Sequence, residues 1–222
     1  MTAARVCPHC GRALPEGADV RGLCPACLLS TAAALGDVPC PYDVISPIEQ
    51  DATSVSYLAR ELAAARRYVV LRIFAAAVDT DAIRARFERW KPALERFRHR
   101  GAARVIDAGV TEDGTAFVAS DYVAGPSLTD FLSYRTSKRA DREDMSAQID
   151  DIVAAAHRHG LAHLDLGLSR IKVAALDRLY ISIVGFGVAL IVDDRNADFA
   201  ADLEAVASIR EQLLRPTSGR VT

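Results

Sequence analysis

The chain has 222 residues, of which 50% are hydrophobic and 25% are charged. This composition is typical of a globular protein with enough apolar residues for one or two packed domains. The formal net charge of -2 excludes a strong overall positive field for nucleic acid. No apolar stretch reaches the roughly 20 residues of a membrane span, and no apolar run follows Met1, so we expect a cytoplasmic protein.

Two CxxC pairs lie near the N-terminus, separated by a spacer typical of zinc ribbons. Each CxxC turn supplies two thiolates, and four thiolates complete the tetrahedral shell of one Zn²⁺ ion. A complete shell leaves no position open for catalysis, so we predict a structural zinc ribbon over residues 1–29. Two disulfides or a redox CxxC are the alternatives, without a secretory signal or a βαβ unit to favour them. The predicted ligands are Cys7, Cys10, Cys24 and Cys27.

After an Ala-rich linker at 30–41, the pattern changes to strands and helices. Short β-rich runs predict strands at 42–48, 54–59, 68–74, 104–109 and 116–123, and a hairpin of strands at 168–173 and 179–184. Apolar residues three and four apart predict helices at 80–98, 127–132, 145–159 and 200–214. The charge-dense segment 135–143 is expected to be a solvated loop. This order indicates a two-lobed α+β architecture.

Three strings in this order resemble the protein kinase family. The string DYVAGPSL at 121–128 resembles the hinge, AHRHGLAHLDL at 156–166 resembles the approach to the catalytic loop, and GFG at 185–187 stands at the DFG position. The whole is similar to bacterial Ser/Thr kinases that carry a CPxCG…CPxC ribbon. The resemblance implies a kinase-like N-lobe at 42–123 and a C-lobe at 124–222, which we expect to be truncated because the later helices of the family are missing.

The resemblance also assigns the positions that carry phosphoryl transfer. Asp165 matches the catalytic base, but the two magnesium-binding positions are Arg170 and Gly185. Because Mg²⁺ needs oxygen ligands, we expect Asp165 to be vestigial and Mg-ATP not to bind. The phosphate-covering loop at 49–54 has no glycine. Arg72 replaces the lysine that contacts phosphates, and we take it as a candidate nucleotide-binding residue.

Other residues match structural positions of the family. Trp90 stands where the helix glutamate belongs, and Pro92 is expected to disturb that helix. His163 is expected to be a packed core histidine. Asp202 resembles the buried aspartate that braces the catalytic loop.

These substitutions predict a catalytically inactive pseudokinase with a signalling role as a protein-binding or regulatory scaffold. One alternative is a divergent Ser/Thr kinase or nucleotide-binding protein with Asp165 as base. Another is a nucleic-acid-binding zinc-ribbon protein, for which the basic residues of the ribbon are few and are opposed by acidic neighbours. These basic residues are Arg5, Arg12 and Arg21.

The partner is expected to be another protein or a second copy of the chain. In the last helix, apolar residues at spacings of 3, 3 and 4 form a stripe that we expect to be partly uncovered. With the helix at 145–159, this stripe would mediate docking, unless the segment 188–199 folds back over it. The stripe consists of Leu203, Val206, Ile209 and Leu213.

Overall fold

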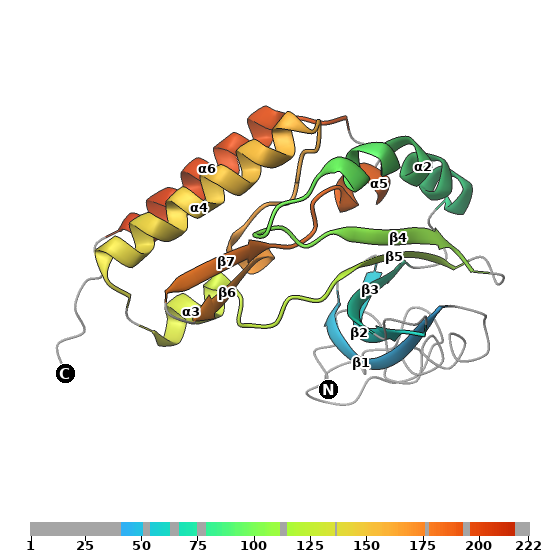
Figure 1. Cartoon of the computed structure of the whole chain (residues 1–222), viewed down its shortest axis with the longest axis horizontal. Coiled ribbons are helices and arrows are strands. Elements are labelled where there is room, and N and C mark those ends of the chain that lie inside the picture. The colour runs from blue at the N-terminus through green and yellow to red at the C-terminus, as the bar shows by residue number, and fades with distance from the viewer. Residues whose placement is uncertain are drawn as a thin grey trace, which may run out of the picture. The chain divides into compact units, whose positions relative to one another are not determined.

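A computed structural model describes residues 41–50, 54–62, 67–74, 79–111, 115–135, 137–175, 178–192 and 196–215 (Figure 1). These residues form two compact units, one from residues 41–82 and 107–119 and the other from the remainder. The predicted zinc ribbon with its four cysteines, and nearly all of the linker, lie outside the described residues. Among the helices that the structure describes, none is long and apolar enough to cross a membrane.

The first unit is built on a sheet of five strands in the order β1-β2-β3-β5-β4. Their bounds are Tyr42–Gln50, Ser54–Glu61, Tyr68–Phe74, Val105–Val110 and Ala116–Asp121 for β1 to β5. Strands β2 and β3 pair antiparallel without a register shift, whereas β1 contains Pro47 and two shifts, as an edge strand tolerates. Alternate residues of β2 and β3 are buried, which confirms the predicted period of two.

The second unit is mainly helical. Its helices are α2 (Thr80–Arg96, from Ile83 on), α3 (Leu128–Tyr134), α4 (Arg139–Arg158), α5 (Val188–Val192) and α6 (Phe199–Leu214). The strands β6 (Ile171–Ala175) and β7 (Leu179–Ile183) form a separate antiparallel pair. Helices α4 and α6 lie side by side (Figure 1), and contacts from Arg142 to Leu213 and from His157 to Asp202 show that they are antiparallel.

The predicted loop at 135–143 is wrong in its second half, because α4 already begins at Arg139. Asp141 accepts a hydrogen bond from the backbone N–H of Lys138, which satisfies one of the free donors at the start of the helix. Arg139 and Glu143 form an ion pair one turn apart at 2.8 Å. A run of charges thus forms the exposed first turn of a long helix.

The predicted strand at 168–173 begins later than expected. Residues Leu168–Arg170 form a single 3₁₀ turn, η1, and the strand starts at Ile171. Arg170 donates its backbone N–H to the carbonyl oxygen of Gly167, which closes this turn ahead of the strand.

The apolar stripe of α6 is uncovered only at its first residue, so less of it is exposed than the sequence suggested. Val206, Ile209 and Leu213 are buried, and only Leu203 remains exposed, at 58%. The buried side chains lie on the helix that packs against α4. Spacings of 3, 3 and 4 mark the face that meets a neighbouring helix, and here that neighbour belongs to the same chain.

Gly125 allows the chain to pass close to β6 on its way into α3. Its φ of +124° is one that other residues rarely adopt, and an added Cβ would lie 2.4 Å from the carbonyl oxygen of Val173. The close approach is held by a hydrogen bond of 3.0 Å from the N–H of Val173 to the carbonyl of Pro126.

We therefore expect Gly125→Ala to lower the free energy of unfolding by about 3 kcal/mol, since a backbone oxygen cannot move aside cheaply. The matched control is Gly160→Ala, where φ is also positive but no atom lies within 4 Å of an added Cβ. That control should cost only about 1 kcal/mol. Chemical denaturation followed by circular dichroism measures both, and equal losses would contradict the packing argument.

Candidate functional site

The carboxylate of Asp202 holds the loop that follows α4. It is 1% exposed, and it accepts hydrogen bonds from the backbone N–H groups of His163 at 2.7 Å and Leu164 at 2.8 Å. His157 Nε2 lies 2.9 Å from the same carboxylate. A buried carboxylate is stable only with such donors, so the predicted brace at Asp202 is confirmed.

The brace supports an unusual backbone conformation at Leu164. Its φ of 63° is the only positive value at a non-glycine residue in the part of the chain that the structure describes. A side chain in the left-handed region costs about 1–2 kcal/mol, which surrounding contacts must offset. The two hydrogen bonds to Asp202 are such contacts, and the residue that follows the strained position is Asp165.

His163 is a core histidine, as predicted from the sequence. It is 1% exposed, its Nε2 lies 2.9 Å from the carbonyl oxygen of Val184, and its ring meets Phe186 edge-on at 5.0 Å. Burial lowers the pKa of His163, so the neutral ring with a proton on Nε2 is favoured and donates to Val184. The histidine thereby joins the loop to the GFG segment.

Asp165 and Arg170 form an ion pair within this loop. Arg170 Nε and Nη2 lie 3.0 Å and 2.9 Å from the same oxygen of Asp165, Oδ2. The η1 turn ends at Arg170 and brings it back to Asp165, five positions earlier in the sequence. The sequence analysis did not predict that these two side chains bind each other. The Asp165 side chain is still 64% exposed.

The GFG segment leads directly into α5. Phe186 is fully buried and contacts the ring of Phe97 at 5.5 Å as well as His163. Gly187 lies against Leu94 of α2, where an added Cβ would approach Leu94 Cδ2 to 2.6 Å. Arg86 of α2 donates to the carbonyl of Val192 at 2.9 Å, at the last residue of α5. The segment after GFG is therefore packed against α2, and Arg86 is a contact that the sequence pattern did not reveal.

Helix α2 continues through Pro92 to Arg96, so the expected disturbance does not end the helix. Trp90 is half-buried, and the guanidinium of Arg89 lies over its ring at 5.5 Å. Position 90 therefore holds a tryptophan and not the glutamate that would pair with a basic residue of a strand, as the sequence indicated.

The first unit contains the other predicted site residue, Arg72 of β3. Its Nε donates to the buried hydroxyl of Ser54 at 2.7 Å, and its guanidinium lies 5.4 Å from the ring centre of Phe74. Of the segment at 49–54, the structure describes Glu49, Gln50 and Ser54. Arg72 thus contacts Ser54 and Phe74 of the same sheet.

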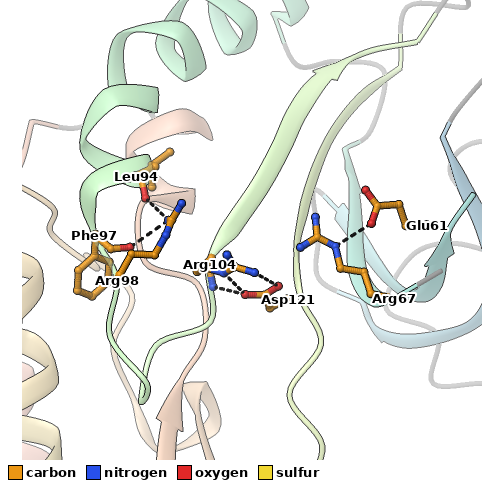
Figure 2. A network of polar contacts seen from close by, with 7 residues as sticks. All are labelled: Glu61, Arg67, Leu94, Phe97, Arg98, Arg104 and Asp121. Atoms are coloured by element: carbon orange, nitrogen blue, oxygen red, sulfur yellow. Dashed lines mark hydrogen bonds and ion pairs between the residues drawn. The ribbon is translucent and has the colours of Figure 1, made fainter. Parts of the chain in front are cut away.

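The hinge string begins with a second ion pair that sequence reasoning missed. Arg104 Nε lies 2.7 Å from Asp121 Oδ2, and its Nη2 lies 3.2 Å from Oδ1 (Figure 2). The hydrogen bond to Asp121 raises the pKa of Arg104, so the guanidinium stays charged. The backbone N–H of Asp121 also donates to the Arg104 carbonyl at 2.9 Å, so Asp121 at the end of β5 is joined to Arg104 through side chain and backbone.

Removing the charge from the brace tests how far the loop depends on it. Asp202→Asn should lower the free energy of unfolding by about 2–4 kcal/mol, because an amide N–H would face the donors of His163 and Leu164. The matched control, Glu204→Gln, alters an exposed carboxylate on the same helix and should change stability by less than about 0.5 kcal/mol. A loss of under 1 kcal/mol for Asp202→Asn, measured by urea denaturation, would show that the brace is dispensable.

No protein-family model matches the chain. Over 115 residues, half of the chain, it is 32% identical to the Serine/threonine-protein kinase pkn3 of Myxococcus xanthus, and it spans about a fifth (21%) of that protein's length.

Solved structures show the same fold over a longer stretch. A double mutant of the Mycobacterium tuberculosis PknI kinase domain matches with a TM-score of 0.63 and 23% identity, over 79% of this chain and 74% of that one. Another crystal structure of the M. tuberculosis PknI kinase domain matches with a TM-score of 0.61 and 22% identity, over 82% and 76% of the two chains. The chain has a protein-kinase-like fold, and half of its sequence is similar to a bacterial Ser/Thr protein kinase.

Proposed function

We propose that the chain is a catalytically inactive, kinase-like protein that acts as a binding or regulatory scaffold in signalling. The observation that carries this proposal is the ion pair between Asp165 and Arg170. At the positions where a kinase presents a base and a metal ligand, this chain presents a carboxylate already neutralised by a guanidinium.

The residues at the metal positions do not fit Mg²⁺. This ion binds through carboxylate, carbonyl or water oxygens in near-octahedral geometry. Arg170 offers only N–H donors, and Gly185 offers no side chain. Within the described ranges, no group of three or more His, Cys, Asp or Glu side chains could hold a metal ion. A cation fixed beside Asp165 would also repel Mg²⁺.

The residue types at the phosphate-binding positions should weaken phosphate binding as well. A glycine-rich loop lets backbone N–H groups approach phosphates, but the segment at 49–54 contains Glu49 and Asp51 and no glycine. Arg72 retains a positive charge at the lysine position, and it is the residue that we propose for any remaining nucleotide contact. Since phosphoryl transfer depends mainly on positioning and charge neutralisation, these changes should remove most of the rate enhancement.

A divergent phosphotransferase remains the competing function, because one observation favours it. The Asp165 side chain is 64% exposed, so its carboxylate is accessible to a hydroxyl group. In that case arginine guanidiniums, rather than a metal, would neutralise the phosphates.

With Mg²⁺ or Mn²⁺, we expect the chain to phosphorylate neither itself nor generic protein substrates. Its activity should be at least about 10³-fold lower than that of an intact kinase domain. Incorporation of labelled phosphate is the measurement, and wild type and Asp165→Asn should both give the background signal. Robust incorporation that Asp165→Asn abolishes would favour the divergent enzyme.

We further propose that residues 1–29 form a structural zinc ribbon with Cys7, Cys10, Cys24 and Cys27 as ligands. The support is the sequence spacing. Purified full-length protein should contain one zinc ion per chain by elemental analysis. Cys24→Ser should lose the metal and the order of the ribbon, while the kinase-like part still unfolds cooperatively.

The matched control for the ribbon is Cys40→Ser, because Cys40 is the fifth cysteine and stands outside both CxxC pairs. This variant should keep its zinc. Full-length protein without metal and with all four ribbon thiols free would refute the ribbon.

A further inference from the structure

Helices α4 and α6 form an open groove of about 530 Å³ on the second unit. This volume is that of a small-molecule site, which in proteins is mostly apolar with a few polar groups. The described residues that line the groove include neither Asp165 nor Arg170, so binding there does not depend on the proposed lack of catalysis. The apolar side chains of the groove are Val153, Ala154, Phe199, Leu203 and Val206.

The apolar side chains of the groove differ in how far they are covered. Val153 and Val206 are buried, whereas Leu203 is 58% exposed and Phe199 is 36% exposed. The ring of Phe199 lies 4.4 Å from that of His157 between ring centres, which holds Phe199 in place. A ligand in the groove would therefore cover apolar surface without having to order its walls first, which lowers the cost of binding.

The groove is lined by two charged side chains, which stand eight residues apart on α4. Arg158, in the last turn of the helix, is exposed and has no ion-pair or hydrogen-bond partner among the residues that the structure describes. The carboxylate of Asp150, by contrast, already pairs with Arg210 at 2.6 Å. Among its described lining residues, the groove thus offers one unpaired positive charge at one end and no unpaired negative charge.

We propose that this groove binds a small carboxylic acid with an unbranched alkyl chain. The carboxylate would pair with Arg158, and the chain would lie along the apolar side chains of α6, from Phe199 toward Val206. Over these residues the helix rises by about 10 Å, which an extended chain of about eight carbons spans. A guanidinium binds a carboxylate through two parallel hydrogen bonds, so it favours an acid over an alcohol or an amine.

An NMR titration of the full chain with sodium octanoate tests the proposal. We expect a dissociation constant of about 1 mM, because an open groove covers only part of an alkyl chain. A fully buried methylene group strengthens binding by about fourfold, so in this groove each added carbon from butanoate to octanoate should give about twofold. Octanol and octylamine, which have the same chain without the carboxylate, should bind more weakly than octanoate.

Two variants with matched controls test the two parts of the groove. Arg158→Gln should weaken octanoate binding about fivefold and leave octanol binding unchanged, because only the acid uses the guanidinium. Its control is Arg139→Gln, since Arg139 is an exposed arginine of α4 that does not line the groove. Leu203→Asp should weaken octanoate binding at least about fivefold by removing an apolar contact and adding a like charge. Its control is Glu204→Gln, an exposed residue of α6 outside the groove.

Both controls should bind octanoate as the wild type does, and all four variants should keep its thermal stability, which separates lost binding from lost folding. The proposal would be overturned by a wild type that binds no octanoate at about 10 mM. Octanol or octylamine that binds as tightly as octanoate, or a Leu203→Asp variant with unchanged affinity, would overturn it as well. A chain that binds phospholipid vesicles through Leu203 but not free octanoate would overturn it in favour of a membrane surface.

Discussion

The second unit depends on one buried carboxylate. Asp202 accepts hydrogen bonds from two consecutive backbone N–H groups, those of His163 and Leu164, and it contacts His157 as well. These bonds hold Leu164 at a positive φ and thereby fix the direction in which Asp165 leaves the loop. Because α6 supplies the carboxylate and α4 supplies His157, the same contact also joins these two helices.

The packing around the loop does not depend on the side chains that phosphoryl transfer needs. His163, Phe186 and Phe97 form a continuous packed group that links the loop, the GFG segment and α2. The positions for metal ligands have instead a guanidinium and a glycine. Packing and hydrogen bonding of the backbone require one set of residues and phosphoryl transfer requires another, so the fold can persist without the catalytic set.

Much of this architecture could be predicted from the sequence, because its signals are local. The bounds of β3 were predicted to the residue, the brace by Asp202 followed from the family resemblance, and His163 was expected to be a packed core residue. The burial of Val206 and its neighbours was missed, since periodicity identifies an apolar face but not the helix that covers it.

The pair of Asp165 and Arg170 was missed for a related reason. Its formation depends on the η1 turn, and nothing in the sequence indicated that turn. The start of α4 could have been found, because Arg139 and Glu143 stand at the i, i+4 spacing of a helical ion pair.

We propose that Arg170 and Gly185 prevent a metal-nucleotide complex from binding. The most direct measurement is the melting temperature with an ATP analogue, with and without Mg²⁺, for the wild type and for the double variant Arg170→Asn with Gly185→Asp. We expect no magnesium-dependent stabilisation of the wild type and a gain in the double variant, whose side chains restore oxygen ligands. A magnesium-dependent rise in the melting temperature of the wild type would contradict it.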